Sequence, residues 1–272
     1  MYKRLVASYQ LTKYQALGND YLVLDLPGDL DSLRPLLPVL CDRRRGLGSD
    51  GLLAFDHDRM SVRILNPDGS EAEKSGNGLR IVACHAVLEH EAPERFVLHT
   101  QDRANGVRVL SVGDPEVWSA IDIGRPRFVP DEWVELETAA ATVRARLVDV
   151  GNPHCVVFGE PVTEARARQL GPLLERHPRF PNRTNVQLAE VRDRAHLSAV
   201  IWERGAGYTL ASGTSAAAVA AAAMRIGVAA DEVAVAMPGG TLTVRRLPGG
   251  ELEQSGPARR VYRAVVDTAD LI

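Results

Sequence analysis

The chain has 272 residues, of which 45% are hydrophobic and 25% charged, which is typical of a folded globular protein with one large core or two smaller ones. A formal net charge of -3 gives no broad positive field to attract nucleic acid. The sequence also contains no apolar run of about 18 residues, the length that a membrane-spanning helix needs. The three cysteines, Cys41, Cys84 and Cys155, are too scattered for a disulfide framework or a Cys-x-x-Cys metal site, so we expect reduced, mostly buried thiols.

Short β-branched or alternating segments are predicted to be strands, and two Ser-Gly pairs precede predicted helices. In chain order the predicted elements are a strand at 62–65, a helix from Gly76, strands at 96–99, 106–110 and 142–150, a helix from Gly213 and a strand at 242–246. The second helix is apolar on every side, so it must be enclosed by other elements. Each half is therefore predicted to be an α+β unit with a central helix.

The chain also contains an internal repeat. Residues 63–87 and 200–224 share one plan, namely an apolar strand, a polar turn, Ser-Gly and a helix rich in small residues. Upstream, Gly-Asn opens an apolar segment at residue 18 and again at residue 151. We therefore divide the chain into an N-terminal domain, 1–130, and a C-terminal domain, 131–272, joined by a segment rich in proline and acidic residues.

The two Ser-Gly motifs are candidate anion sites. A helix start exposes unpaired N–H groups and a partial positive charge, which together bind a carboxylate or phosphate, and Gly76 and Gly213 allow close approach of a ligand. The structural alternative is that Ser75 and Ser212 are ordinary helix N-caps. Their repetition at matched positions favours a functional role.

Seven segments in order along the chain resemble segments of diaminopimelate epimerase. They are LGNDYLVLD (17–25), CDRRRGLGSDGLL (41–53), NPDGSEAEKSGNGLR (66–80), GNPHCVVF (151–158), NRTNV (182–186), ERGAGYTLASGTSAA (203–217) and SGPARRVY (255–262). Each segment alone is a weak signal, but their number and order make the resemblance specific.

The resemblance implies a fold of two pseudo-symmetric domains, each a strongly curved, mostly antiparallel sheet around a central helix. It also implies an amino acid as the small-molecule substrate, bound between the halves, with no pyridoxal phosphate or other cofactor and no metal. The family inverts an α-carbon with two thiols, one removing the α-proton while the other delivers a proton to the opposite face. The matching positions here are Ser75 and Ser212.

The resemblance further implies contacts for the substrate. Gly76 and Asn77, with Gly213 and Thr214, would hold the reacting carboxylate at the two helix starts. Polar groups beside the thiol positions correspond to His154 and Glu203. The remaining substrate contacts of the family correspond to Asn19, Asn66, Asn152, Asn185, Glu203 and Arg204.

Each of these residues also has a structural interpretation. Asn66 in NPDG suits a type I turn, and Asn19 and Asn152 after glycine can bond their own backbone. Arg204 is able to form a surface ion pair with the neighbouring Glu203, and His154 to be a satisfied core histidine.

Serine in place of cysteine changes the chemistry that the site offers. A thiol has a pKa of about 8.5, and a helix start lowers this pKa further. A hydroxyl, in contrast, becomes a base only when a neighbouring group takes its proton. His154 or Glu203 would have to do so. The ordinary two-thiol mechanism is not available to this chain, and among the cysteines only Cys155, next to His154, is a candidate replacement.

Three accounts of function remain open. The first, which we favour, is a diaminopimelate epimerase-like isomerase that converts LL- to meso-diaminopimelate for lysine biosynthesis, in a natural or engineered serine form. The second is a related racemase or eliminating enzyme with a different amino acid, and the third is an inactive amino-acid-binding homologue. Tyr208 and Ser215 depart from the family's usual residues and favour a natural serine lineage. The start of the chain lacks the pattern of a signal peptide, so a cytoplasmic location is expected, and a homodimer is compatible with the sequence.

Overall fold

The computed structural model describes residues 8–71, 75–101 and 103–271, which form two compact units. The first unit comprises the described residues up to Ala120 together with those from Pro257 onward, and the second comprises Ile121–Gly256. The chain passes between the units within two strands, β7 (Glu116–Gly124) and β16 (Leu252–Asp267). Among the described residues, no helix has the length and apolar character needed to span a bilayer.

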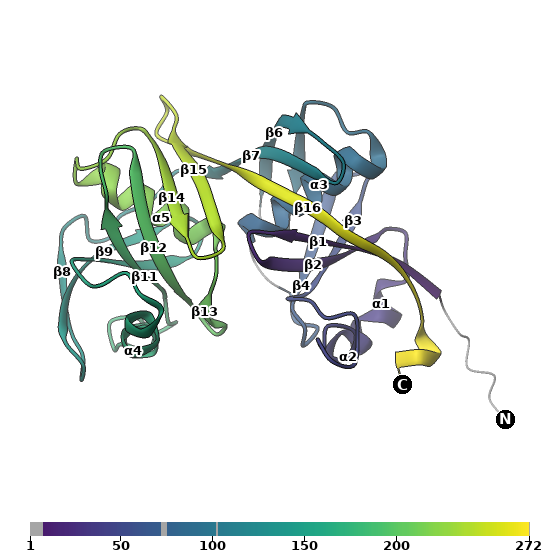
Figure 1. Cartoon of the computed structure of the whole chain (residues 1–272), viewed down its shortest axis with the longest axis horizontal. Helices are drawn as coiled ribbons and strands as arrows, with labels where there is room; N and C mark the ends of the chain where they lie inside the picture. Colours follow the sequence, from purple (N-terminus) through teal and green to yellow (C-terminus); the bar gives the residue numbers. More distant parts are fainter. Residues whose placement is uncertain (1–7, 72–74, 102, 272) are drawn as a thin grey trace. The chain divides into compact units, whose positions relative to one another are not determined.

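The first unit is a sheet packed around one long helix (Figure 1). The long helix is α3 (Gly76–His90). Besides α3, β7 and β16, the elements of this unit are β1 (Ser8–Ala16), β2 (Asn19–Asp25), α1 (Leu30–Leu33), η1 (Arg34–Leu36), α2 (Leu37–Leu40), β3 (Leu52–Asp56), β4 (Ser61–Leu65), β5 (Arg95–His99), β6 (Ala104–Val112) and η2 (Thr268–Leu271). The strands follow one another in the order β1 to β7, and β16 neighbours β7 and pairs with β1, which closes the sheet.

The second unit repeats this plan around α5 (Figure 1). Its elements are β8 (Val134–Glu137), β9 (Thr142–Asp149), β10 (Pro153–Phe158), α4 (Glu164–Glu175), β11 (Asn185–Val191), β12 (His196–Glu203), β13 (Gly207–Thr209), α5 (Gly213–Arg225), β14 (Glu232–Met237) and β15 (Gly240–Arg246). The helix α4 packs outside against β11, β12 and β13.

The pairing directions of the strands confirm the internal repeat. From β1 to β6 the successive pairs are antiparallel, parallel, antiparallel, parallel and antiparallel. The same series recurs through β9, β10, β11, β12, β14 and β15. Each parallel pair needs a crossover, and the central helices α3 and α5 supply the second crossover of each series. The predicted fold class, two α+β units with mostly antiparallel sheets around a central helix, is confirmed.

The central helices owe their position to their composition. Residues 213–224 of α5 are all buried, and Ala side chains occupy most of that stretch, so strands approach the helix closely on every side. Residues 76–86 of α3 are also buried, including Arg80, which is fully enclosed. A helix with no exposed face is stable only inside such a sheet, which confirms that the second helix is enclosed.

Candidate functional site

The predicted site residues of the first unit lie at one end of its strands, where β2 starts and β4 ends. Asn19 begins β2, and Asn66 directly follows β4, whose end pairs with the start of the adjacent β3. Ser75, Gly76 and Asn77 open α3, which follows the turn after β4. Because β2 and β3 are parallel and β3 and β4 antiparallel, the start of β2 and the end of β4 lie at the same end of the sheet's strands.

The second unit places its predicted residues in the corresponding way. Asn152 directly precedes β10, His154 lies near its start, and Asn185 begins the parallel β11 opposite His154. Glu203 ends β12, Arg204 follows it, and Ser212, Gly213 and Thr214 open α5. The structure therefore places the predicted residues in two sets, one in each unit, which are called the first and second half-sites below.

Both serines cap their helices in the manner that the structural alternative describes. The Ser75 hydroxyl oxygen accepts a hydrogen bond from the Gly78 backbone N–H at 2.9 Å. The Ser212 oxygen accepts one from the Ser215 N–H at 3.4 Å and lies 3.5 Å from the Thr214 hydroxyl. A capping serine uses its oxygen as an acceptor and keeps its own proton, so capping and proton transfer are chemically compatible.

In the first half-site, Arg80 fixes the side chain of Asn77. The Arg80 guanidinium donates to Asn77 Oδ1 at 2.6 Å and to the Gly76 carbonyl at 3.5 Å. Asn77 Nδ2 in turn donates to Asn19 Oδ1 at 3.3 Å. Burial lowers the pKa of Arg80 below its usual range. A cation enclosed beside the first turn of α3 adds to the positive end of the helix dipole and favours an anion there.

Asn19 is in turn held by a charged network. Its Nδ2 donates to Asp50 Oδ2 at 2.5 Å, and the guanidinium of Arg43 bridges Asp50 at 2.7 Å and Asp20 at 2.5 Å. Lys13 forms an ion pair with Asp20 at 2.6 Å. Burial raises the pKa of Asp50, whereas hydrogen bonds from Arg43 and Lys13 outweigh burial at Asp20 and lower its pKa. Asn19 therefore bonds side chains of other elements and stays oriented toward Asn77.

Asn66 has the contacts of a turn residue. Its carbonyl accepts from the Gly69 N–H at 2.9 Å, its N–H donates to the Ser70 carbonyl at 2.8 Å, and its Nδ2 donates to the Ser70 hydroxyl at 2.9 Å. These local bonds match the turn interpretation of the NPDG segment.

In the second half-site, a buried chain of hydrogen bonds leads from His154 toward Ser212. His154 Nε2 lies 2.8 Å from Asn152 Oδ1, and its Nδ1 lies 2.9 Å from Gln187 Nε2. The same Gln187 nitrogen donates to the Ser215 hydroxyl at 2.9 Å, and the Ser215 N–H bonds Ser212. With Gln187 donating, His154 carries its proton on Nε2, which leaves Nδ1 as the acceptor.

The side chain of Asn185, at the start of β11, is hydrogen-bonded to the start of β10 and to the residue that follows β12. Its Nδ2 donates to the Pro153 carbonyl at 3.1 Å, and its Oδ1 accepts from the Arg204 N–H at 2.9 Å. The Arg204 guanidinium reaches the Asn182 carbonyl at 3.4 Å. Glu203 is half-buried at the end of β12, opposite Gly207.

Sequence reasoning assigned no role to several residues that hold these half-sites. Arg43 and Asp50 lie in the segment 41–53 but were not singled out, and Gln187 and Ser215 connect His154 to the α5 start. One local signal was present, since Asn77 and Arg80 are three residues apart on a helix and share a face. Gln187 and His154 are joined only by the parallel pairing of β10 and β11, which no local pattern reveals.

The cysteines do not supply the missing thiolates. All three are free and buried, which confirms the expected reduced thiols. Burial raises the pKa of Cys84 and Cys155 to about 12 and also raises that of Cys41. A buried thiol with a raised pKa stays protonated at neutral pH, so Cys155 does not replace the serines as a base.

Comparisons with known proteins agree with this arrangement. A family model of diaminopimelate epimerase matches residues 11–129 and 146–261. Diaminopimelate epimerase 2 of Nostoc sp. is 43% identical over 86% of this chain and 87% of its own length, and the enzyme of Carboxydothermus hydrogenoformans is 34% identical over 93% and 98%.

Solved structures share the fold at low sequence identity. A predicted epimerase from Pseudomonas aeruginosa superposes with a TM-score of 0.70 at 17% identity, covering 95% of this chain and 99% of its own. A hydroxyproline epimerase from Agrobacterium vitis gives 0.67 at 18% identity, covering 98% and 93%. The repeated pairing pattern, the two serine-capped helix starts and the sequence matches lead to one conclusion: the chain belongs to the diaminopimelate epimerase family.

Proposed function

We propose that the chain is a cofactor-independent isomerase that inverts an amino-acid α-carbon, with LL-diaminopimelate converted to meso-diaminopimelate as its reaction. The observation that carries the proposal is the repeated half-site. Each unit presents a helix start in which a serine is followed by glycine and a small polar residue, Asn77 or Thr214. The 43% identity to a relative named diaminopimelate epimerase supports the choice of substrate.

In this proposal the helix starts bind the reacting carboxylate. One serine accepts the α-proton of the substrate, and the other donates a proton to the opposite face of the α-carbon. The N–H groups of the first turns and the helix dipoles stabilise the negative charge that develops when the α-proton is removed. Ser75 and Ser212 each need a neighbouring group to accept the hydroxyl proton. On the second unit, Gln187 donates to both His154 and Ser215 and so fixes their positions near the start of α5, but it does not itself carry a proton.

The serine chemistry is slower than thiol chemistry. Each unit of mismatch in pKa costs about 1.4 kcal/mol, and a hydroxyl is several units less acidic than a thiol. We therefore propose a weak epimerase, whose turnover falls well below that of relatives with two thiols.

A second candidate function is amino-acid binding without turnover. It is supported by the serines themselves, since a serine hydroxyl does not ionise at neutral pH unless a neighbouring base takes its proton. In this case the carboxylate-binding helix starts are retained and proton transfer is lost.

Calorimetry with LL- and meso-diaminopimelate tests the binding step that both candidates share. We expect saturable binding of both isomers to the full chain and weaker binding to Asn77→Ala, because that variant removes the amide held beside the first turn of α3. The exposed Asn182→Ala serves as the matched control and should bind like the unmodified chain. Absence of binding to any diamino acid would remove the substrate assignment.

A further inference from the structure

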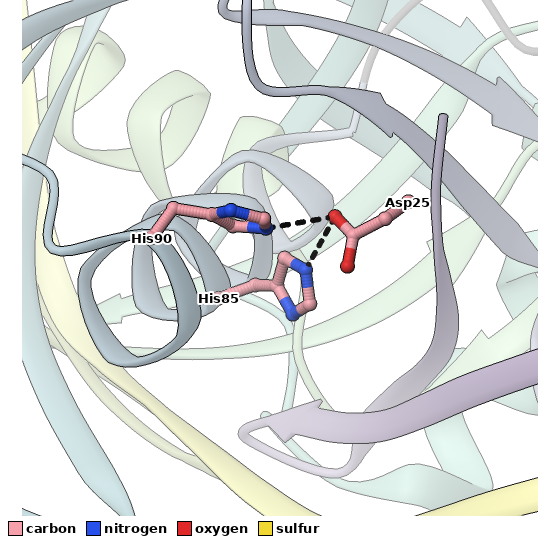
Figure 2. Close-up of side chains that lie close together, drawn as sticks. All are labelled: Asp25, His85 and His90. Carbon is pink, nitrogen blue, oxygen red and sulfur yellow. Dashed lines mark hydrogen bonds and ion pairs between the residues drawn. The ribbon is translucent and has the colours of Figure 1, made fainter. Parts of the chain in front are cut away.

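Three side chains of the first unit converge at the end of α3 that lies opposite Ser75. Asp25 is the last residue of β2, His85 lies in the penultimate turn of α3, and His90 is its last residue. The Nε2 atoms of both histidines lie 2.9 Å from the same carboxylate oxygen, Asp25 Oδ1 (Figure 2). The three ligand-type atoms all lie within 4.8 Å of one another.

We propose that Asp25, His85 and His90 bind a divalent transition metal of the zinc class. Zinc binds imidazole nitrogen and carboxylate oxygen at about 2.0–2.2 Å, so tetrahedral ligand atoms lie roughly 3.3 Å apart. The two nitrogen–oxygen separations of 2.9 Å need only a small opening to accept such an ion. Two imidazoles and one carboxylate favour zinc over Mg²⁺ or Ca²⁺, which take oxygen ligands.

His85 has the outer partner that a metal-binding histidine requires. Its Nδ1 lies 3.0 Å from the hydroxyl of Tyr14, and that hydroxyl also reaches Glu89 Oε1 at 3.4 Å. Glu89 is paired with Arg260 at 2.8 Å, which holds it as a carboxylate acceptor. Such outer partners fix the tautomer and the ring orientation of the ligand.

The hydrogen-bond chain accommodates both states of the site. Without metal, His85 Nε2–H donates to Asp25 and the Tyr14 hydroxyl donates to His85 Nδ1. With metal, His85 coordinates through Nε2, its proton resides on Nδ1 and is donated to Tyr14, and Tyr14 donates to Glu89.

Access to the site comes from the side of Asp25 and His90. The Asp25 side chain is 44% exposed and that of His90 is 23% exposed, whereas His85 is only 2% exposed. The ring of His57 stacks on His90 at 4.7 Å between centroids and holds it in place. Three protein ligands leave a fourth position for water, which the exposed side supplies.

The proposed metal site is distant from Ser75, where the proposed reaction takes place. A helix of the length of α3 spans about 20 Å, so the metal would lie far from the Ser75 end of the same helix. Its effect would be to clamp the end of α3 to the end of β2. Binding the folded state alone, the ion would stabilise the chain by mass action.

Zinc titration of the metal-stripped full chain tests this proposal by calorimetry and thermal unfolding. We expect one zinc per chain, a raised Tm, no such effect from Mg²⁺, and visible absorption of four-coordinate Co²⁺. His90→Ala should lose the binding, and Tyr14→Phe should weaken it about 10- to 100-fold through the outer partner. His99→Ala removes an exposed histidine of β5 that is not among the ligands and should still bind one zinc.

The proposal is overturned if the unmodified chain binds no zinc, or if His90→Ala binds zinc as tightly as His99→Ala does. Thermal unfolding of each metal-free variant checks that it is folded. Should His90→Ala be unfolded, Asp25→Asn replaces it, because the amide keeps a hydrogen-bond acceptor for the histidines but is a poor metal ligand; unchanged zinc affinity in Asp25→Asn would equally overturn the assignment.

Discussion

Ser75 and Ser212 are the residues on which the rate of the proposed reaction depends most. A cysteine at each position restores a group with a pKa of about 8.5 that a helix start lowers further. We expect Ser75→Cys/Ser212→Cys to raise exchange of the substrate α-hydrogen with deuterium oxide by at least about tenfold, the effect of one pKa unit. Nuclear magnetic resonance of diaminopimelate measures the exchange, and an unchanged rate would show that these positions do not transfer protons.

Gln187 joins two buried polar groups, so its loss should be costly. Gln187→Ala leaves His154 Nδ1 and the Ser215 hydroxyl without the amide that now bonds both. We expect a loss of about 2 kcal/mol or more in the free energy of unfolding, measured with urea. Gln169→Ala, at an exposed position of α4, should change it by under about 0.5 kcal/mol. Equal effects of the two substitutions would contradict the network.

Asp20 makes stability depend on pH. Burial would raise its pKa, but hydrogen bonds from Arg43 and Lys13 lower it below the value of an unfolded aspartate, about 3.9. Its contribution is therefore present above that value and is lost as the pH falls through the lowered pKa of the folded state. We expect Asp20→Asn to destabilise the chain at pH 7 by about 2 kcal/mol or more and to do so less as the pH falls below about 4.

Urea unfolding at a series of pH values measures that difference. Asp58→Asn is the control, because the Asp58 side chain is 83% exposed and should have little effect at any pH. A difference between Asp20→Asn and the unmodified chain that stays constant from pH 7 to pH 3 would argue against the ion pairs.

The sequence identified the residues at the two helix starts because Ser-Gly before an apolar helix is a local signal. It did not identify the side chains that orient them. Asp50 holds Asn19 through a contact between β2 and the loop before β3, and Gln187 reaches Ser215 across the unit. Asp25 and His85 are far apart in sequence and meet only because α3 packs against β2. Such pairs depend on tertiary packing and leave no pattern of residue spacing.

Among the elements, two helices and five strands with clear periodicity were predicted, whereas α4 and most other strands were not. The helices beginning at Gly76 and Gly213 and the strands β4, β5, β6, β9 and β15 are present where the sequence predicted them. The α4 segment contains Gly171 and Pro172, which usually interrupt a helix. The helix forms because Leu170 and Leu174 are buried in the core formed with β11 and β12.

Gly171 is required for the packing of α4. A Cβ at this position would lie 2.4 Å from the ring of Trp202, which the fold holds by a 2.8 Å bond to Glu175. Gly171→Ala gains up to about 1 kcal/mol of helix propensity, but overpacking costs about 1–3 kcal/mol, so we expect a net loss of stability. Gly113→Ala meets only Glu116 O at 3.4 Å and should be nearly neutral. Thermal unfolding compares the two, and a more stable Gly171→Ala would contradict the packing.

At the scale of the whole molecule, one series of strand directions occurs twice, with a serine-capped helix after the fourth strand each time. The repeat was visible in the sequence because both copies keep the Ser-Gly helix start and the upstream Gly-Asn. The two copies differ in what supports them, Arg80 and Asn19 in the first unit and Gln187 and His154 in the second. The two helix starts therefore have different polar surroundings.

The most direct test of the account is deuterium uptake at the α-carbon of diaminopimelate, measured with the unaltered chain in deuterium oxide and with Ser75→Ala/Ser212→Ala as the control. The account predicts slow but measurable uptake from both LL- and meso-diaminopimelate by the unaltered chain and none by the control. Tight binding of both isomers without uptake at any pH from about 6 to 10, a range that spans the ordinary titration of histidine, would contradict it and leave amino-acid binding as the function of the two half-sites.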